Sequence, residues 1–140
     1  AANNLADLLL ARNKDLPLAL SLANMAYADS RGDPLSVHTA DTLAKALIQT
    51  GYPAKALHVA HVAAAAEPEE PGRQLRLGIA LAEAGNEAKA LTSLNKVVEL
   101  APDSPHGKVA QKVIARLNDK TDGTKGKAAE GHRDEAVREK

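Results

Sequence analysis

Residues 43–57 read LAKALIQTGYPAKAL, and residues 77–91 read LGIALAEAGNEAKAL. The two stretches are 34 residues apart, and the same offset relates Pro68 to Pro102. Self-similarity at a fixed period of this length is typical of arrays of two-helix units. The repeat therefore predicts an all-α fold in which helical hairpins are stacked side by side.

The residues that flank the repeat unit predict where its helices begin and end. Leu43 and Leu47 form an apolar stripe at helical spacing, followed by Gly51. Glycine adopts the left-handed conformation that closes a helix, so Gly51 and Gly85 mark the ends of the first helices. The second helices are expected to begin near Pro53 and at Asn86, a capping residue, and to end at Pro68 and Pro102. Further helices are expected to open at Pro34, Pro71 and Pro105, with Asp33 and Ser104 as N-caps.

Composition narrows the class of function. The chain has 140 residues, enough for one domain or a short repeat array, and 44% of them are hydrophobic. Eighteen basic residues balance eighteen acidic ones, and two Tyr are the only aromatic residues. This balance argues against nucleic-acid binding, which needs basic surface and stacking side chains. There is no Cys for a disulfide or a thiolate site, and no apolar run long enough to span a membrane.

The 34-residue unit resembles the tetratricopeptide repeat, a helix–turn–helix module. Residues 37–70 carry the pattern at Ala40, Leu43, Ala44, Leu47, Gly51, Ala56, Ala60, Ala63 and Pro68. Residues 71–104 carry it at Gln74, Leu77, Gly78, Leu81, Gly85, Ala90, Leu94, Val97 and Pro102. Ala40 and Gln74 depart from the usual Trp, and Ala60 departs from the usual Phe. The resemblance implies a right-handed solenoid whose first helices line a concave groove.

Upstream and downstream segments complete the expected array. Residues 1–34 look like a degenerate repeat with a linker, because Leu5, Ala6 and Leu9 resemble the first-helix motif and Ala19, Ala23 and Ala26 the second. Residues 35–70 and 71–104 are the two regular repeats. Residues 105–118 are expected to form an amphipathic capping helix, since terminal repeats expose an apolar face. Residues 119–140 are highly charged and are expected to be disordered or only locally helical.

The groove implied by the resemblance has a specific set of candidate binding residues. They are His38, Asp41, Lys45, Ile48, Gln49, Leu75, Ile79 and Glu83. Such a mixture of apolar and charged groups suits an extended peptide or a helix. For Ile48, Leu75 and Ile79 a second interpretation stays open, in which neighbouring helices cover them. No nucleophile or phosphate-binding loop accompanies the polar stripe, so we expect no enzyme activity and no cofactor.

Two more specialised sites are disfavoured. His58 and His61 are three residues apart on a second helix but lack further ligands, so we expect two solvated histidines and no metal site. The carboxylate clamp of chaperone-binding relatives would need cations where Asp7, Thr42 and Gly72 stand. Only Asn3 and Arg76 match that clamp, and Asp7 would repel a carboxylate.

The sequence thus predicts a non-catalytic scaffold that binds a protein or peptide in its groove, as part of a larger bacterial protein or assembly. The alternative is an architectural spacer that self-associates through its N-terminal end. Residues Asn3–Ala6 and Ala40–Ala44 resemble the last repeats of bacterial tetratricopeptide proteins of envelope and exopolysaccharide-export systems. That likeness implies a bacterial source, a periplasmic or exported location and a longer parent array.

Overall fold

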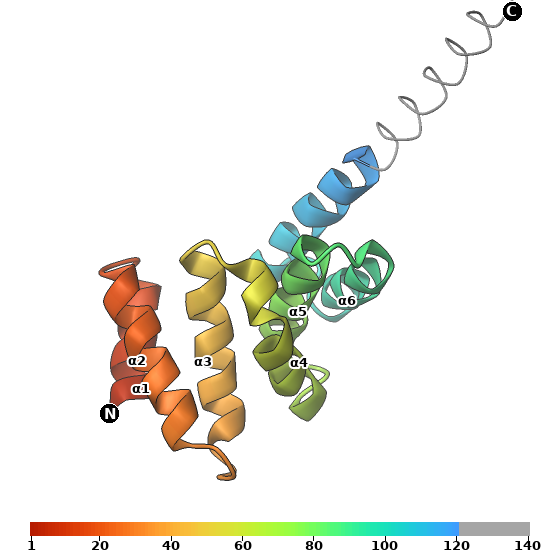
Figure 1. The fold of residues 1–140 in the computed structure, drawn as a ribbon. Coiled ribbons are helices and arrows are strands. Elements are labelled where there is room, and N and C mark those ends of the chain that lie inside the picture. The colour runs from red at the N-terminus through yellow and green to blue at the C-terminus, as the bar shows by residue number, and fades with distance from the viewer. Residues whose placement is uncertain (121–140) are drawn as a thin grey trace, which may run out of the picture.

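The computed structural model describes residues 1–120, and every regular element in them is helical, which confirms the predicted all-α class (Figure 1). The elements are α1 (Ala2–Ala11), α2 (Leu16–Asp29), α3 (Ser36–Gln49), the 3₁₀ turn η1 (Pro53–Ala56), α4 (Leu57–Ala66), α5 (Pro71–Glu83) and α6 (Glu87–Leu100). A further helix begins at residue 105 and continues through residue 120. The predicted charged tail begins at residue 119, but residues 119 and 120 still belong to this helix; residues 121–140 lie outside the described residues.

The helices pack in a regular order along the chain. Each of α1 to α6 contacts the next, and α1 also contacts α3, as α3 contacts α5. We call α1, α3 and α5 the first helices and α2, α4 and α6 the second helices. Contacts between successive second helices are absent from the described part of the chain. The first helices therefore adjoin one another, while a space separates α4 from α6.

All three first helices end in the same hydrogen-bonded turn. The residue at the turn has a left-handed φ: 52° at Asn13, 90° at Gly51 and 88° at Gly85. The next backbone N–H donates back to a carbonyl five residues earlier: Lys14 to Leu9 at 2.9 Å, Tyr52 to Leu47 at 2.7 Å and Asn86 to Leu81 at 2.9 Å. This is the Schellman closure. The predicted helix ends at both glycines are confirmed, and Asn13 makes the equivalent turn in the first hairpin.

The positions at which the helices begin agree only in part with the predictions from the sequence. The side chains of Asn86 and Ser104 accept hydrogen bonds from the N–H three residues later, as predicted for N-caps. The prediction at Pro34 is wrong, because α3 begins two residues later at Ser36. The Asp33 carboxylate instead accepts the N–H of Leu35 at 2.9 Å, which holds the linker in a local turn.

Small residues make up much of the core, so the helix pairs approach closely. Ten of its alanines are fully covered: Ala6, Ala19, Ala23, Ala40, Ala44, Ala46, Ala56, Ala80, Ala90 and Ala110. At the crossing of α5 and α6, a Cβ added to Gly78 would lie 2.7 Å from two side-chain carbons of Leu94. Leu94 is itself fully buried. Gly78 is thus required by the packing of this pair, not by its backbone conformation.

The helix from residue 105 packs on the end of the array. Ala110 and Leu117 are buried in the common core, and Val113 and Ile114 pack partly against it. Its first turn lies so close to the end of α6 that a Cβ on Gly107 would sit 2.8 Å from the Pro102 carbonyl oxygen, and closer still to that of Ala101. This close approach fixes where the helix leaves the array.

Candidate functional site

The first helices carry two adjoining hollows, which we call the first-helix hollows. One, of about 530 Å³, lies between α1 and α3, and the other, of about 440 Å³, extends from α1 across α3 to α5. Asp7 and Lys45 line both. The two hollows are therefore parts of one surface, to which all three first helices contribute.

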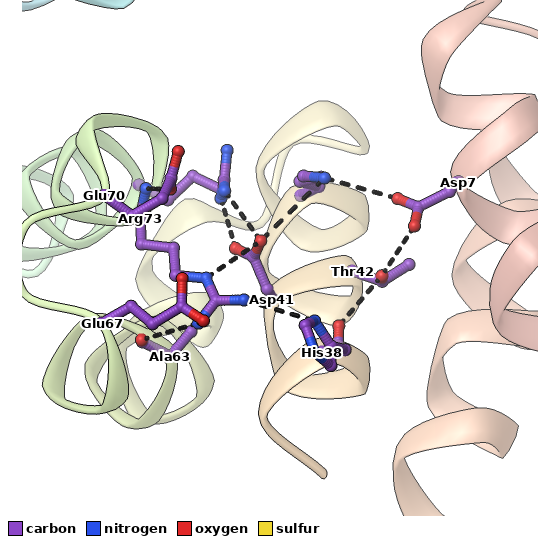
Figure 2. A network of polar contacts seen from close by, with 10 residues as sticks. Asp7, His38, Asp41, Thr42, Ala63, Glu67, Glu70 and Arg73 are labelled. Atoms are coloured by element: carbon purple, nitrogen blue, oxygen red, sulfur yellow. Dashed lines mark hydrogen bonds and ion pairs between the residues drawn. The ribbon is translucent and has the colours of Figure 1, made fainter. Parts of the chain in front are cut away.

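An ion pair between α3 and α5 lies at the centre of this surface (Figure 2). Arg76 donates two hydrogen bonds to the Asp41 carboxylate, from Nε to Oδ1 at 2.7 Å and from Nη2 to Oδ2 at 2.9 Å. Both side chains are largely covered, with 14% and 13% of their surfaces exposed. A two-point contact of this kind fixes both the distance and the relative rotation of the two groups.

Arg73, one turn before Arg76, is more deeply buried and has several partners. Its guanidinium lies 3.6 Å from Asp41 Oδ2 and 3.6 Å from Glu67 Oε1, and it donates to the Ala63 carbonyl at 3.4 Å. His38 Nδ1 lies 3.4 Å from its Nη2 (Figure 2). A buried guanidinium needs such partners because an unpaired charge in the interior is strongly destabilising. Arg73 thus ties α3, α4 and α5 together.

The pair between α1 and α3 is more open to solvent. Lys45 Nζ lies 3.4 Å from Asp7 Oδ1 and 4.0 Å from Asp41 Oδ2. The Thr42 hydroxyl donates to the other Asp7 oxygen at 3.2 Å (Figure 2). The Lys45 and Asp7 side chains are 35% and 41% exposed. Solvent screening weakens such a pair, so these two groups remain available to a bound partner.

The structure places the predicted binding residues in different surroundings. His38, Asp41, Lys45 and Gln49 line the first-helix hollows. Ile48 and Ile79 are half-buried and pack against the core. Glu83 is exposed at the end of α5 and lines neither hollow.

Leu75 must be removed from the candidate site. Its side chain belongs to the buried core and only 6% of it is exposed, so it is not available as an anchor for a partner. The reason is that α5 is enclosed by its neighbours: it packs against α3, α4 and α6, and Gly72, one turn before Leu75, faces His106 of the last helix. Of the two interpretations left open by the sequence for this residue, coverage by neighbouring helices is the one observed.

Arg73, Arg76 and Thr42 belong to this network but are not among the predicted binding residues. Arg73 and Thr42 were not assigned to the groove, although they supply the most buried cation and the bridge to Asp7. A signal was present for Arg73, because it precedes Arg76 by three residues on one helical face. Thr42 offered none, since a threonine within a helix is compatible with many surroundings.

A larger hollow lies elsewhere, between the second helices α4 and α6. We call it the second-helix trough; its volume is about 850 Å³. Leu77 and Leu81 of α5 form its floor, and the rim includes Lys55, His58 and His61 on one side and Lys89 on the other. No residue lines both the trough and the first-helix hollows among residues 1–120. Both histidines are exposed, as the sequence predicted, and they border this hollow.

Two other kinds of site are absent from the described range. Residues 1–120 contain no cluster of three or more His, Cys, Asp or Glu side chains suited to a metal ion. None of the helices in the same range is both long and apolar enough to cross a membrane.

Comparison with known proteins gave no relatives: no protein-family model matches the chain, and no curated protein matches it.

Proposed function

We propose that this chain is a tetratricopeptide-like scaffold that binds a segment of a partner protein on the face formed by α1, α3 and α5. The observation that carries the proposal is the pair of first-helix hollows, which share Asp7 and Lys45 and draw on all three first helices. The identical closure of the three first helices supports a repeat array, because each hairpin ends its first helix in the same way.

The charges on this face favour a polar, extended segment. Asp7 and Lys45 are paired only at 3.4 Å and are partly exposed, so each can exchange its present partner for a group on a ligand. The carboxamide oxygen of Asn3, beside them in the hollow, is buried without a hydrogen-bond partner in the described structure. Because no group within residues 1–120 pairs with this oxygen, it carries a desolvation cost.

Site-specific photo-crosslinking tests this function. A benzophenone amino acid is placed at Gln49, which is exposed and lines a first-helix hollow, and, as the control, at Lys112, which is exposed on the last helix. In extract of the cells that make the protein, we expect a discrete protein adduct from position 49 and none from position 112. The variant Lys45→Gln should reduce the adduct at position 49, because it removes the charge that orients the partner. Equal adducts from both positions would contradict the proposal.

A second function is favoured by one observation. The first hairpin exposes four large apolar side chains: Leu5, Leu8, Leu18 and Met25, with 43–54% of each accessible. An apolar end surface of this kind suits association with another copy, or with a preceding repeat of a longer array. Light scattering at several concentrations tests self-association. Leu8→Glu should shift any dimer toward monomer, whereas Leu35→Glu, at an exposed leucine in the linker, should not.

A further inference from the structure

We propose that the second-helix trough is an independent docking site for an acidic amphipathic segment of a partner protein. The apolar side chains of the bound segment would pack on Leu77 and Leu81, which form the trough floor, and its carboxylates would face the lysines and histidines of the rim. The site shares no lining residue with the first-helix hollows within residues 1–120, so it goes beyond the proposed function and does not depend on it.

The shape of the trough favours a helical segment. Leu77 and Leu81 are one turn apart on α5, and His58 and His61 form a parallel row on α4. The trough lies between α4 and α6, and Leu77 and Leu81 of α5 close it from below. An amphipathic helix in such a groove presents apolar residues at spacings of three and four, which match rows of this kind.

The side chains that line the trough favour a partner segment of negative charge. Its lining contains Lys55, Lys89, His58 and His61 and no carboxylate. Lys45 and Lys96 each lie within 3.4 Å of a carboxylate, but neither Lys55 nor Lys89 has an ion pair among the described residues. Lys55 instead lies over the Tyr52 ring, 4.8 Å from its centroid. These ammonium groups, together with the imidazole N–H donors, are complementary to acidic side chains and would repel basic ones.

The test uses two synthetic peptides as probes, each as long as α6. One carries Leu at helical spacings of three and four with Glu at the flanking positions, and the other has Lys in place of every Glu. Binding is followed by fluorescence anisotropy, and the binding surface is mapped by the amide chemical shifts of the protein. We expect saturable binding of the acidic peptide, with the largest shift changes at Leu77, Leu81 and Thr92, and much weaker binding of the basic peptide.

Variants then separate the contributions of charge and shape. Lys89→Glu should weaken binding of the acidic peptide at least about tenfold, because it reverses a rim charge. Thr92→Trp should also weaken binding without any change of charge, because Thr92 is exposed and lines the trough. Lys112→Glu makes the same charge change on the last helix, away from the trough, and should leave the affinity unchanged. Circular dichroism confirms that each variant is folded.

Several outcomes would overturn the proposal. They are the absence of saturable binding at about 1 mM peptide, equal affinities for the two peptides, or shift changes on α1 and α3 in place of α5 and α6. A trough that binds only a second copy of the chain would show concentration-dependent self-association that Thr92→Trp abolishes. The result is separable from the proposed function, because Gln49→Trp alters only the first-helix hollows and should leave peptide affinity unchanged.

Discussion

Arg76 on α5 holds the carboxylate of Asp41 on α3 by two hydrogen bonds, of 2.7 and 2.9 Å, across the contact between two first helices. Asp41 also lies 3.6 Å from the buried guanidinium of Arg73, so this carboxylate is shared by two arginines. Asp41 therefore positions the face on which we place the binding function, and its primary role is structural. A partner would contact this face mainly through the more exposed Asp7, Lys45 and Gln49.

Removal of the Asp41 charge should destabilise the array. We expect Asp41→Asn to lower the free energy of unfolding by about 2–3 kcal/mol, because the largely covered Arg76 loses its charged partner and Arg73 keeps only Glu67 as a carboxylate partner among the described residues. The matched change Asp7→Asn should cost less than about 1 kcal/mol, since its pair with Lys45 is open to solvent. Urea denaturation followed by circular dichroism measures both. If both variants lost the same free energy of unfolding, the ion pair between α3 and α5 would stabilise the array no more than the exposed pair between α1 and α3.

At the crossing of α5 and α6, even the addition of one methyl group should destabilise the protein. A glycine-to-alanine change inside a helix usually stabilises by about 0.5–1 kcal/mol. Gly78→Ala should instead cost about 1–3 kcal/mol, because the new Cβ would overlap the buried side chain of Leu94. Gly72→Ala is the control, since its nearest atoms lie 3.2 Å away at the ends of flexible side chains. A thermal midpoint raised by Gly78→Ala would show that the two helices are farther apart than described.

The three helix ends should respond to backbone conformation alone. Gly51→Ala and Gly85→Ala should each cost about 1–2 kcal/mol, because alanine is strained at positive φ although the space around both sites is open. At the equivalent turn in the first hairpin, Asn13→Gly should be neutral or stabilising, whereas Asn13→Ala should destabilise. Differential scanning calorimetry of the four variants gives the comparison. If Asn13→Ala were harmless, the left-handed turn at that position would be in doubt.

The last helix should depend on Gly107. A side chain there would meet the carbonyl oxygens of Ala101 and Pro102, which are backbone atoms and cannot turn aside. We expect Gly107→Ala to cost about 3 kcal/mol and to increase hydrogen exchange of the amides in residues 105–120. Lys108→Ala, at the neighbouring exposed position, should change neither measurement. Unchanged protection in the Gly107→Ala variant would contradict the observed docking of this helix.

The sequence by itself determined the helical class and the turns of the regular repeats. A glycine that closes a helix and an Asn or Ser that caps one act within a few residues, so Gly51, Gly85, Asn86 and Ser104 were predicted correctly. The N-cap prediction at Asp33 was wrong, because an aspartate can also close a turn. Its carboxylate accepts the N–H of Leu35 within the linker, and α3 begins later, at Ser36.

Only the tertiary structure decided which polar groups face a partner and which are already paired. Asp41 and Lys45 lie on one stripe of α3, yet Arg76, 35 residues after Asp41, engages the first far more closely than Asp7 engages the second. The burial of Leu75 and the trough beside His58 and His61 likewise follow from the spacing between helices. Helix periodicity fixes the direction of a side chain around its own axis, but what that side chain meets depends on how closely the next helix packs.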